Sequence, residues 1–180
     1  MPEQKKQKLQ DTGLVEWSVF SELVAMDEDE EGFSKNLFVT FVDQFKETFE
    51  EIEYLVRQRS DLEKLSSLGH YLKGSAAALG LNTISIQCER IQNYGKMDNF
   101  DHFELSKDLQ DDTPIKDKEN EQEKEKDVKS TNKQEETPDD KEKDNDDQIW
   151  FLLIKDACEK AKDGFEKLRA ALNDYFDGGL

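Results

Sequence analysis

The chain has 180 residues and a formal net charge of -18, with 38% charged and 34% hydrophobic residues. This negative charge would repel the phosphates of nucleic acids and anionic membranes, so we expect neither as a partner. The composition is too polar for one compact globule throughout, which predicts that part of the chain is disordered. No secretory signal opens the sequence, and its longest apolar run, residues 149–154, is far shorter than the ~20 residues of a membrane span, which favours an intracellular, soluble protein.

The first third of the chain predicts a polar tail over residues 1–12 and two helices. A short helix over 13–26 carries more apolar surface than one narrow stripe, so it either buries two faces or exposes an apolar patch. A longer helix over 33–57 has a continuous stripe typical of a hydrophobic core, made of Phe38, Phe41, Val42, Phe45, Phe49, Ile52 and Val56.

Residues 60–80 predict a helix with both ends marked. Ser60 and Glu63 form a candidate capping box, and Gly80 suits a left-handed residue after the helix. One face is apolar, through Leu62, Leu65, Leu68, Leu72, Ala76 and Leu79. His70 points roughly 140° away from that face, among small residues and close to Lys73. We therefore expect its imidazole to face solvent or a partner.

The remaining chain predicts two more helices separated by an acidic insertion. Asn82 is a candidate cap for a helix over 82–99 with Gln92 at the edge of its apolar stripe, followed by a short helical continuation over 100–109. Residues 110–148 are mostly acids and lysines, which predicts disorder, and 149–177 restore a helical apolar face. The fold predicted is all-α: a single domain over 13–180, an antiparallel four-helix bundle of helices 33–57, 61–79, 82–99 and 149–177 with a short additional N-terminal helix.

The residues offer little chemistry beyond His70. Cys88 and Cys158 are better interpreted as buried thiols than as a disulfide. No nucleotide-binding loop, kinase glycine loop, HExxH or CxxC motif is present, so we expect no ATP site, no kinase activity and no metal site. His70 is then either an inert surface residue or an acceptor of a phosphoryl or acyl group whose transfer is catalysed by a partner.

The sequence around His70 resembles a known family. Residues 70–75, HYLKGS, are similar to the HxxKGS signature of histidine-containing phosphotransfer (HPt) proteins. Residues 78–81, ALGL, and 88–93, CERIQN, resemble the fungal members, the Ypd-type phosphorelay intermediates of yeasts, and so do Trp17, Met26-Asp27 and residues 33–35.

The resemblance implies a function and a set of site residues. His70 would accept a phosphoryl group from the receiver-domain aspartate of a hybrid sensor histidine kinase and pass it to the aspartate of downstream response regulators. The chain would need no cofactor of its own, because the partner receiver domain would supply Mg²⁺. Lys73 would neutralise phosphoryl charge, Gly74 would leave room for the partner, and Gln92 would orient the imidazole ring.

The resemblance also implies a docking surface and a cellular context. Val19, Leu23, Met26 and Leu37 correspond to the apolar surface of the family that binds receiver domains, flanked by Ser75 and by Lys96, which stands where the family has an arginine. By the same resemblance, the chain would be a monomer in cytoplasm and nucleus and would act in osmotic or stress signalling. Two alternatives remain open: a non-catalytic adaptor that binds through the first-helix patch, and an acidic chaperone that acts through the insertion.

Overall fold

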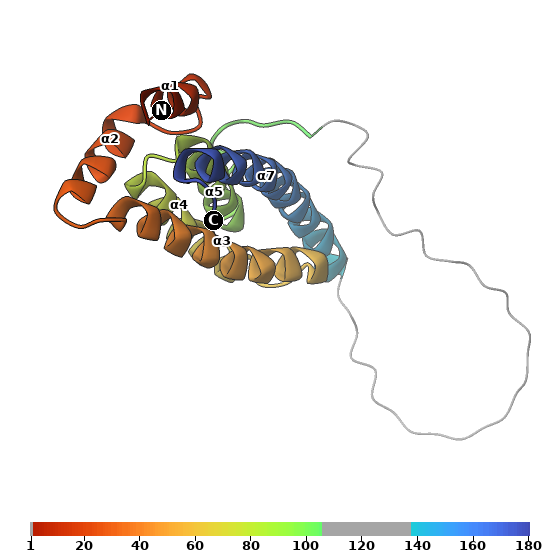
Figure 1. Cartoon of the computed structure of the whole chain (residues 1–180). Helices are drawn as coiled ribbons and strands as arrows, with labels where there is room; N and C mark the ends of the chain where they lie inside the picture. Colours follow the sequence, from red (N-terminus) through yellow and green to blue (C-terminus); the bar gives the residue numbers. More distant parts are fainter. Residues whose placement is uncertain (1, 106–137) are drawn as a thin grey trace, which may run out of the picture.

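The computed structural model describes residues 2–105 and 138–180, and within these ranges all regular secondary structure is helical (Figure 1). The elements are α1 (Pro2–Asp11), α2 (Trp17–Ala25), the 3-10 turn η1 (Met26–Glu28), α3 (Phe33–Gln58), α4 (Leu62–Ala78), α5 (Asn82–Gly95) and α7 (Pro138–Phe176). The predicted all-α class is confirmed.

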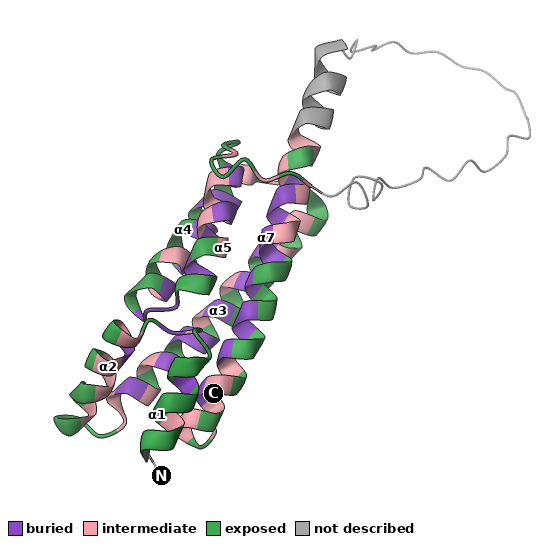
Figure 2. Ribbon diagram, turned by 90° about the horizontal axis from the view of Figure 1, so that it is seen from above, coloured by how far each residue is buried: buried purple, intermediate pink, exposed green. Residues whose placement is uncertain are grey.

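Four of these helices form an antiparallel bundle. α4 packs against α3 and α5, and α7 packs against the same two helices from the other side. The order around the bundle is therefore α3, α4, α5, α7, and the α4/α5 face lies opposite the α3/α7 face. Figure 2 shows buried residues following the sides of these helices that face one another. The predicted four-helix bundle is confirmed.

Aromatic side chains fill much of the core. Phe45 of α3 stacks on Phe165 of α7 with ring centroids 4.1 Å apart, and on Phe49 at 4.8 Å. Phe20 of α2 is completely buried and lies 5.5 Å from Phe38 and 6.4 Å from Phe176. This second cluster attaches α2 to one end of the bundle, because burying a phenylalanine contributes about 1.5–3 kcal/mol.

The helix ends differ from the predicted caps in detail. Asp61, not Ser60, is the N-cap of α4, and its Oδ1 accepts a 2.9 Å hydrogen bond from the Lys64 amide. Leu81, not Asn82, precedes the first residue of α5. Gly80 has the expected positive φ of 71°, and Leu81 N donates a 2.9 Å hydrogen bond to Ala76 O. This is the pattern of a helix that ends at a residue in the left-handed conformation.

The predicted polar tail is wrong, because residues 2–11 form α1. Leu9, the only large apolar residue after Met1 in the predicted tail, is 3% exposed. Lys8 Nζ lies 2.8 Å from the Asp174 carboxylate of α7, and Lys5 also pairs with Asp177. The tail is therefore a helix because α7 and the residue that follows it supply an apolar site and charge partners, and two short helices precede the bundle instead of one.

Two other boundaries also differ. α5 ends at Gly95, and residues 101–105 are not helical, because Asn99 bonds the backbone N and O of Phe103 and so competes with a helical turn. α7 begins at Pro138, before the predicted 149, at a proline of the kind that suits a first helical position. Of the predicted disordered insertion, 110–148, residues 110–137 lie outside the described residues, and residues 138–148 belong to α7.

Candidate functional site

The candidate site is centred on His70, which the structure places on the solvent side of α4. The residues at 65, 72 and 76 on the same helix are completely buried, whereas His70 is exposed. The predicted outward orientation of the imidazole is thus confirmed. A histidine in this position is accessible to another protein without any movement of the bundle.

Gln92 of α5 contacts the imidazole directly. Its Nε2 lies 3.2 Å from His70 Nδ1, so the two residues that the family resemblance linked are brought together across the α4/α5 contact. The contact occupies Nδ1 and leaves the other ring nitrogen, Nε2, directed away from Gln92. The ring is therefore oriented by a group from the neighbouring helix.

The Gln92 amide can also serve a ring that carries its proton on Nδ1. Its Oε1 is buried and has no hydrogen-bond partner within the described part of the chain. A 180° rotation of the amide exchanges Oε1 and Nε2, after which Oε1 accepts from Nδ1–H. In that tautomer the lone pair of His70 Nε2 is free to act as a nucleophile.

Two glycines that the sequence analysis missed hold α4 and α5 close together. A Cβ on Gly69 would lie 2.7 Å from Gln92 N and 2.9 Å from Cys88 O. A Cβ on Gly95 would lie 2.7 Å from both Leu62 O and Ser66 N. Each distance is too short for any other residue, so these glycines set the helix separation at which Gln92 reaches His70. The feature of the sequence that could have pointed to them is a glycine inside a predicted helix, because glycine there lowers helix stability by about 1 kcal/mol relative to alanine.

Lys73 lies one turn after His70 and is held by an ion pair. Its Nζ is 2.8 Å from Glu89 Oε1 of α5, and both side chains are a little over one-third exposed. Glu89 is not among the site residues expected from the sequence. The pair keeps the ammonium on the α4/α5 face, the same face that carries the imidazole.

Gly74 differs from the other two helical glycines near the site. No atom lies within 4 Å of the position that a Cβ would occupy there. Packing inside this chain therefore does not require glycine at 74. The position adds open space next to His70, in agreement with the clearance expected from the sequence.

The other expected partner-binding residues lie on several elements. Ser75 of α4 is half-buried, and Lys96 is exposed directly after α5. Val19 and Leu23 of α2 and Leu37 of α3 are half-buried, whereas Met26 of η1 is 49% exposed; these last four residues are called the apolar patch below. The elements that carry the patch pack against one another.

Backbone contacts connect α2 to the end of the histidine helix. Glu16 N donates a 2.7 Å hydrogen bond to Gly80 O, and the Glu16 carboxylate accepts one of 3.0 Å from Asn82 Nδ2. Hydrogen bonds from Asn82 and then Ser18 lower the pKa of the Glu16 carboxyl. Gly80 also contacts α2 closely, since a Cβ there would lie 3.0 Å from Val19 Cβ.

Arg90 is a buried charge near the site that sequence reasoning did not identify. It is 5% exposed, pairs with Asp156 of α7 at 3.0 Å and with Asp101 at 3.2 Å, and stacks over the Phe103 ring at 4.4 Å. It therefore fixes the segment after α5 against α7. Its role is structural, because all its contacts lie inside the protein.

The described residues contain neither a membrane-spanning helix nor a metal-binding cluster. None of the helices in ranges 2–105 and 138–180 has the length and apolar character needed to span a bilayer. Over the same ranges, no group of three or more histidine, cysteine or acidic side chains is arranged to hold a metal ion.

Comparison with known proteins identifies the family. Residues 36–113 match the family model described as the Hpt domain. The chain is 49% identical to the phosphorelay intermediate protein YPD1 of Candida albicans, over 98% of this chain and 100% of that protein. It is 35% identical to the protein of the same name from Saccharomyces cerevisiae, over 93% and 96% of the two chains.

The fold is also similar to solved structures of the yeast protein. One is a co-crystal structure of the Saccharomyces cerevisiae histidine phosphotransfer signaling protein Ypd1 with the receiver domain of its downstream response regulator Ssk1. It matches with a TM-score of 0.66 and 30% identity over 93% of this chain and 97% of that one. The bundle, the exposed histidine and the matched relatives agree, and the chain belongs to the Hpt family of phosphorelay intermediate proteins.

Proposed function

We propose that this chain carries a phosphoryl group on His70 between two kinds of receiver domain. The donor is the aspartyl phosphate of the receiver domain of a hybrid sensor histidine kinase, and the acceptors are the aspartates of downstream response regulators. The observation that carries the proposal is the exposed imidazole whose Nδ1 is held by Gln92 at 3.2 Å, which leaves Nε2 as the reacting nitrogen.

The transfer step follows from this geometry. The lone pair of His70 Nε2 forms a bond to phosphorus, and the bond between phosphorus and the donor aspartate oxygen breaks, so the carboxylate leaves with the electron pair. The proton on Nδ1 stays on the ring, where Oε1 of the rotated Gln92 amide accepts it in a hydrogen bond. The return step to a second aspartate reverses these bonds.

The receiver domain supplies the remaining chemistry in this proposal. Mg²⁺ and the catalytic side chains that surround the aspartate belong to the partner, and this chain needs no cofactor and has no ATP site. Phosphoryl transfer depends mainly on positioning and on neutralising charge. Lys73, 2.8 Å from Glu89, adds a cation on the histidine face, and the phosphoryl group competes with Glu89 for it.

Partner binding uses the surface around His70. The apolar patch seats the receiver, Gly74 leaves space for its approach, and Ser75 and Lys96 lie at the edge of the contact. The co-crystal structure of the yeast relative with a receiver domain supports this proposal. The chain would work as a monomer in cytoplasm and nucleus, with osmotic stress as the signal, and without contact to nucleic acid or membrane.

The test is a transfer assay with an isolated phosphorylated receiver domain. Wild-type chain should gain a phosphate that is labile in acid and stable in alkali, whereas His70→Gln should gain none. His102→Gln, which changes the only other histidine, is the matched control and should be labelled normally. Labelling of His70→Gln would refute the assignment, and receiver binding without any transfer would favour the adaptor alternative.

A further inference from the structure

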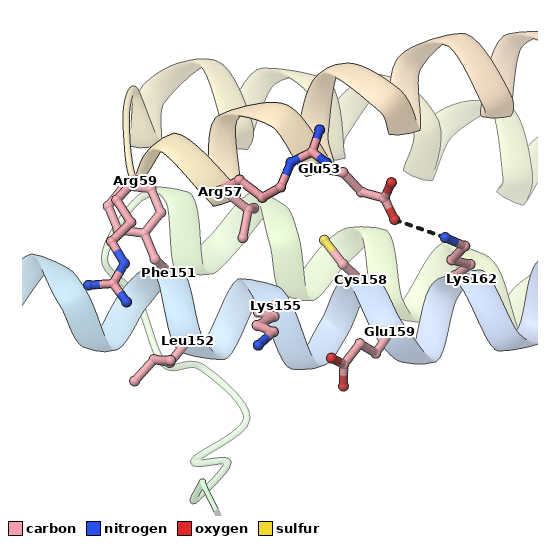
Figure 3. Close-up of a pocket in the computed structure, with 10 residues that line it drawn as sticks. Glu53, Arg57, Arg59, Phe151, Leu152, Lys155, Cys158, Glu159 and Lys162 are labelled. Carbon is pink, nitrogen blue, oxygen red and sulfur yellow. Dashed lines mark hydrogen bonds and ion pairs between the residues drawn. The ribbon is translucent and has the colours of Figure 1, made fainter. Parts of the chain in front are cut away.

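A groove on the α3/α7 face has no role in the proposed phosphotransfer. It encloses about 700 Å³ and is lined by side chains of α3, the residue that follows it and α7 (Figure 3). Because α3 and α7 form the face opposite α4 and α5, the groove lies across the bundle from His70 and Gln92. A molecule bound there would not meet a receiver domain docked at the histidine.

Part of the lining of the groove is apolar and is called the floor below. It consists of Val56 of α3 and of Phe151, Leu152 and Cys158 of α7. Phe151 and Cys158 are 7% and 6% exposed, whereas Val56 and Leu152 are half-buried and so leave apolar surface open to the groove. Figure 3 shows these α7 side chains beside the charged ones that form the rim.

The charge of the rim is opposite to that of the whole chain. Arg57, Arg59, Lys155 and Lys162 line the groove together with the carboxylates of Glu53 and Glu159. One carboxylate, Glu53, is already paired with Lys162 at 3.3 Å. The chain as a whole has 25 basic and 43 acidic residues. A net positive groove on so acidic a protein attracts negatively charged groups selectively.

Two arginines on the rim are available to a ligand. Arg57 and Arg59 are exposed, and the structure shows no ion pair for either guanidinium within the described residues. An arginine guanidinium binds carboxylates in a bidentate geometry and is weakly hydrated, which suits an interface.

The shape of the groove favours a helix as its occupant. On α7 the lining residues run from Phe151 to Lys162 along one side of the helix, at steps of three and four residues. At a rise of ~1.5 Å per residue this side is about 16 Å long, the length of a helical segment of three turns. Apolar anchors at matching steps would enter the floor while acidic side chains reach the rim.

We propose that this groove binds an acidic amphipathic helix of a partner protein, at the same time as a receiver domain occupies the histidine face. Binding of the helix to the groove is independent of the proposed phosphotransfer, whereas simultaneous binding rests on the proposed docking of a receiver domain at His70. It assigns the chain a second interaction surface that could bring a further protein into the signalling complex.

The test measures binding of a defined probe to the full chain by fluorescence anisotropy. The probe is a labelled 20-residue helical peptide with leucine at apolar heptad positions and glutamate elsewhere, and a scrambled peptide of the same composition is the reference. The probe should bind more tightly than the scrambled peptide, and more weakly as salt is raised.

Charge-reversal variants locate the binding site. Arg57→Glu should weaken binding of the probe about tenfold or more, since it replaces an attraction with a repulsion. Lys46→Glu makes the same kind of change at an exposed position of α3 outside the groove, and should alter binding less than about twofold. Leu152→Glu should weaken binding through the floor, and circular dichroism checks that each variant is folded.

A receiver domain added in excess should leave the affinity of the probe unchanged. Three results would overturn the proposal: equal binding to Arg57→Glu and Lys46→Glu, displacement of the probe by the receiver domain, or equal binding of the scrambled peptide. Displacement by a peptide of residues 110–137 of this chain would also overturn it, because the occupant would then be the chain's own segment.

Discussion

Substituting Gly69 by alanine tests the helix separation that allows Gln92 to reach His70. The new methyl group would lie 2.7 Å from Gln92 N, 2.9 Å from Cys88 O and 3.1 Å from a methyl group of Ile91. Two of these three atoms belong to the backbone, so a change of side-chain rotamer cannot relieve the overlap and α4 must move away from α5.

The magnitude follows from two opposing effects. Overpacking of this kind destabilises by about 1–3 kcal/mol, and backbone contacts place Gly69→Ala near the upper end. Alanine in place of a helical glycine also stabilises the helix by about 1 kcal/mol, through its higher helix propensity. The net loss in the free energy of unfolding is about 2 kcal/mol, or about 4–8 °C in Tm for a domain of this size.

Gly74→Ala is the matched control, because it lies in the same helix and on the other side of His70. No atom lies within 4 Å of its Cβ position, so only the helix-propensity gain remains, about 1 kcal/mol of added stability. The two variants should therefore differ by about 3 kcal/mol in urea unfolding followed by circular dichroism.

The two variants should also differ in which part of the site they affect. Gly69→Ala should break the contact between His70 and Gln92, which nuclear magnetic resonance of the imidazole nitrogens detects, whereas Gly74→Ala should leave those signals unchanged and weaken receiver binding. Equal stability changes in both variants, or an unchanged imidazole in Gly69→Ala, would show that the α4/α5 separation is not set by this glycine.

Three further predictions concern Gln92, Asp27 and Cys88. Gln92→Ala should slow phosphoryl transfer about two- to tenfold with the fold intact, because a hydrogen bond that orients the His70 ring is worth about 0.5–1.5 kcal/mol; single-turnover transfer measures it. Asp27→Ala should lower the free energy of unfolding by about 1–3 kcal/mol, since the Asp27 carboxylate accepts from Ser34 N at 2.7 Å and from its hydroxyl at 2.5 Å, and Ser34 is completely buried. Thermal melts measure this loss, and Asp27→Asn should lose less stability than Asp27→Ala; equal losses would contradict the role of these hydrogen bonds. Burial raises the pKa of the Cys88 thiol from 9.0 to about 12, so its contribution to stability is complete below pH 9 and is lost as the pH rises toward 12. The free energy of unfolding should then fall by up to about 1.4 kcal/mol per pH unit from this group, and urea titrations at pH 8 and 11 should show a shallower fall for Cys88→Ala.

The bundle helices could be predicted because their apolar periodicity is local information. The phenylalanine stripe of α3 marks one face over 26 residues, and the helix forms as Phe33–Gln58 against the predicted 33–57. The orientation of His70 followed from the same periodicity. The contact between His70 and Gln92 came only from the family resemblance, since residues 22 apart in sequence have no periodic relation.

The features that the sequence did not reveal depend on neighbouring elements. α1 buries Leu9 only because α7 lies beside it, and a single leucine in a polar stretch gives no helical pattern. Gly69 has a sequence signal no different from that of Gly74, yet only Gly69 faces a second backbone. Asp61 and Ser60 are both good caps, and the choice between them depends on the turn that joins α3 to α4.

The hydrogen bond from Glu16 N to Gly80 O has a consequence for how sequences of this kind can vary. It connects the N-cap of α2, the helix that carries two of the four apolar-patch residues, to the turn that ends the histidine helix, through backbone atoms that every residue type except proline possesses. Substitution of Glu16 by any residue except proline can therefore preserve the spacing between patch and imidazole, whereas Gly80, with a φ of 71° and close neighbours around its Cβ position, cannot be exchanged freely. Insertion of one residue between Gly80 and Asn82 would change that spacing even if every functional side chain were retained, so relatives of this chain should vary at position 16 more readily than in the length of this turn.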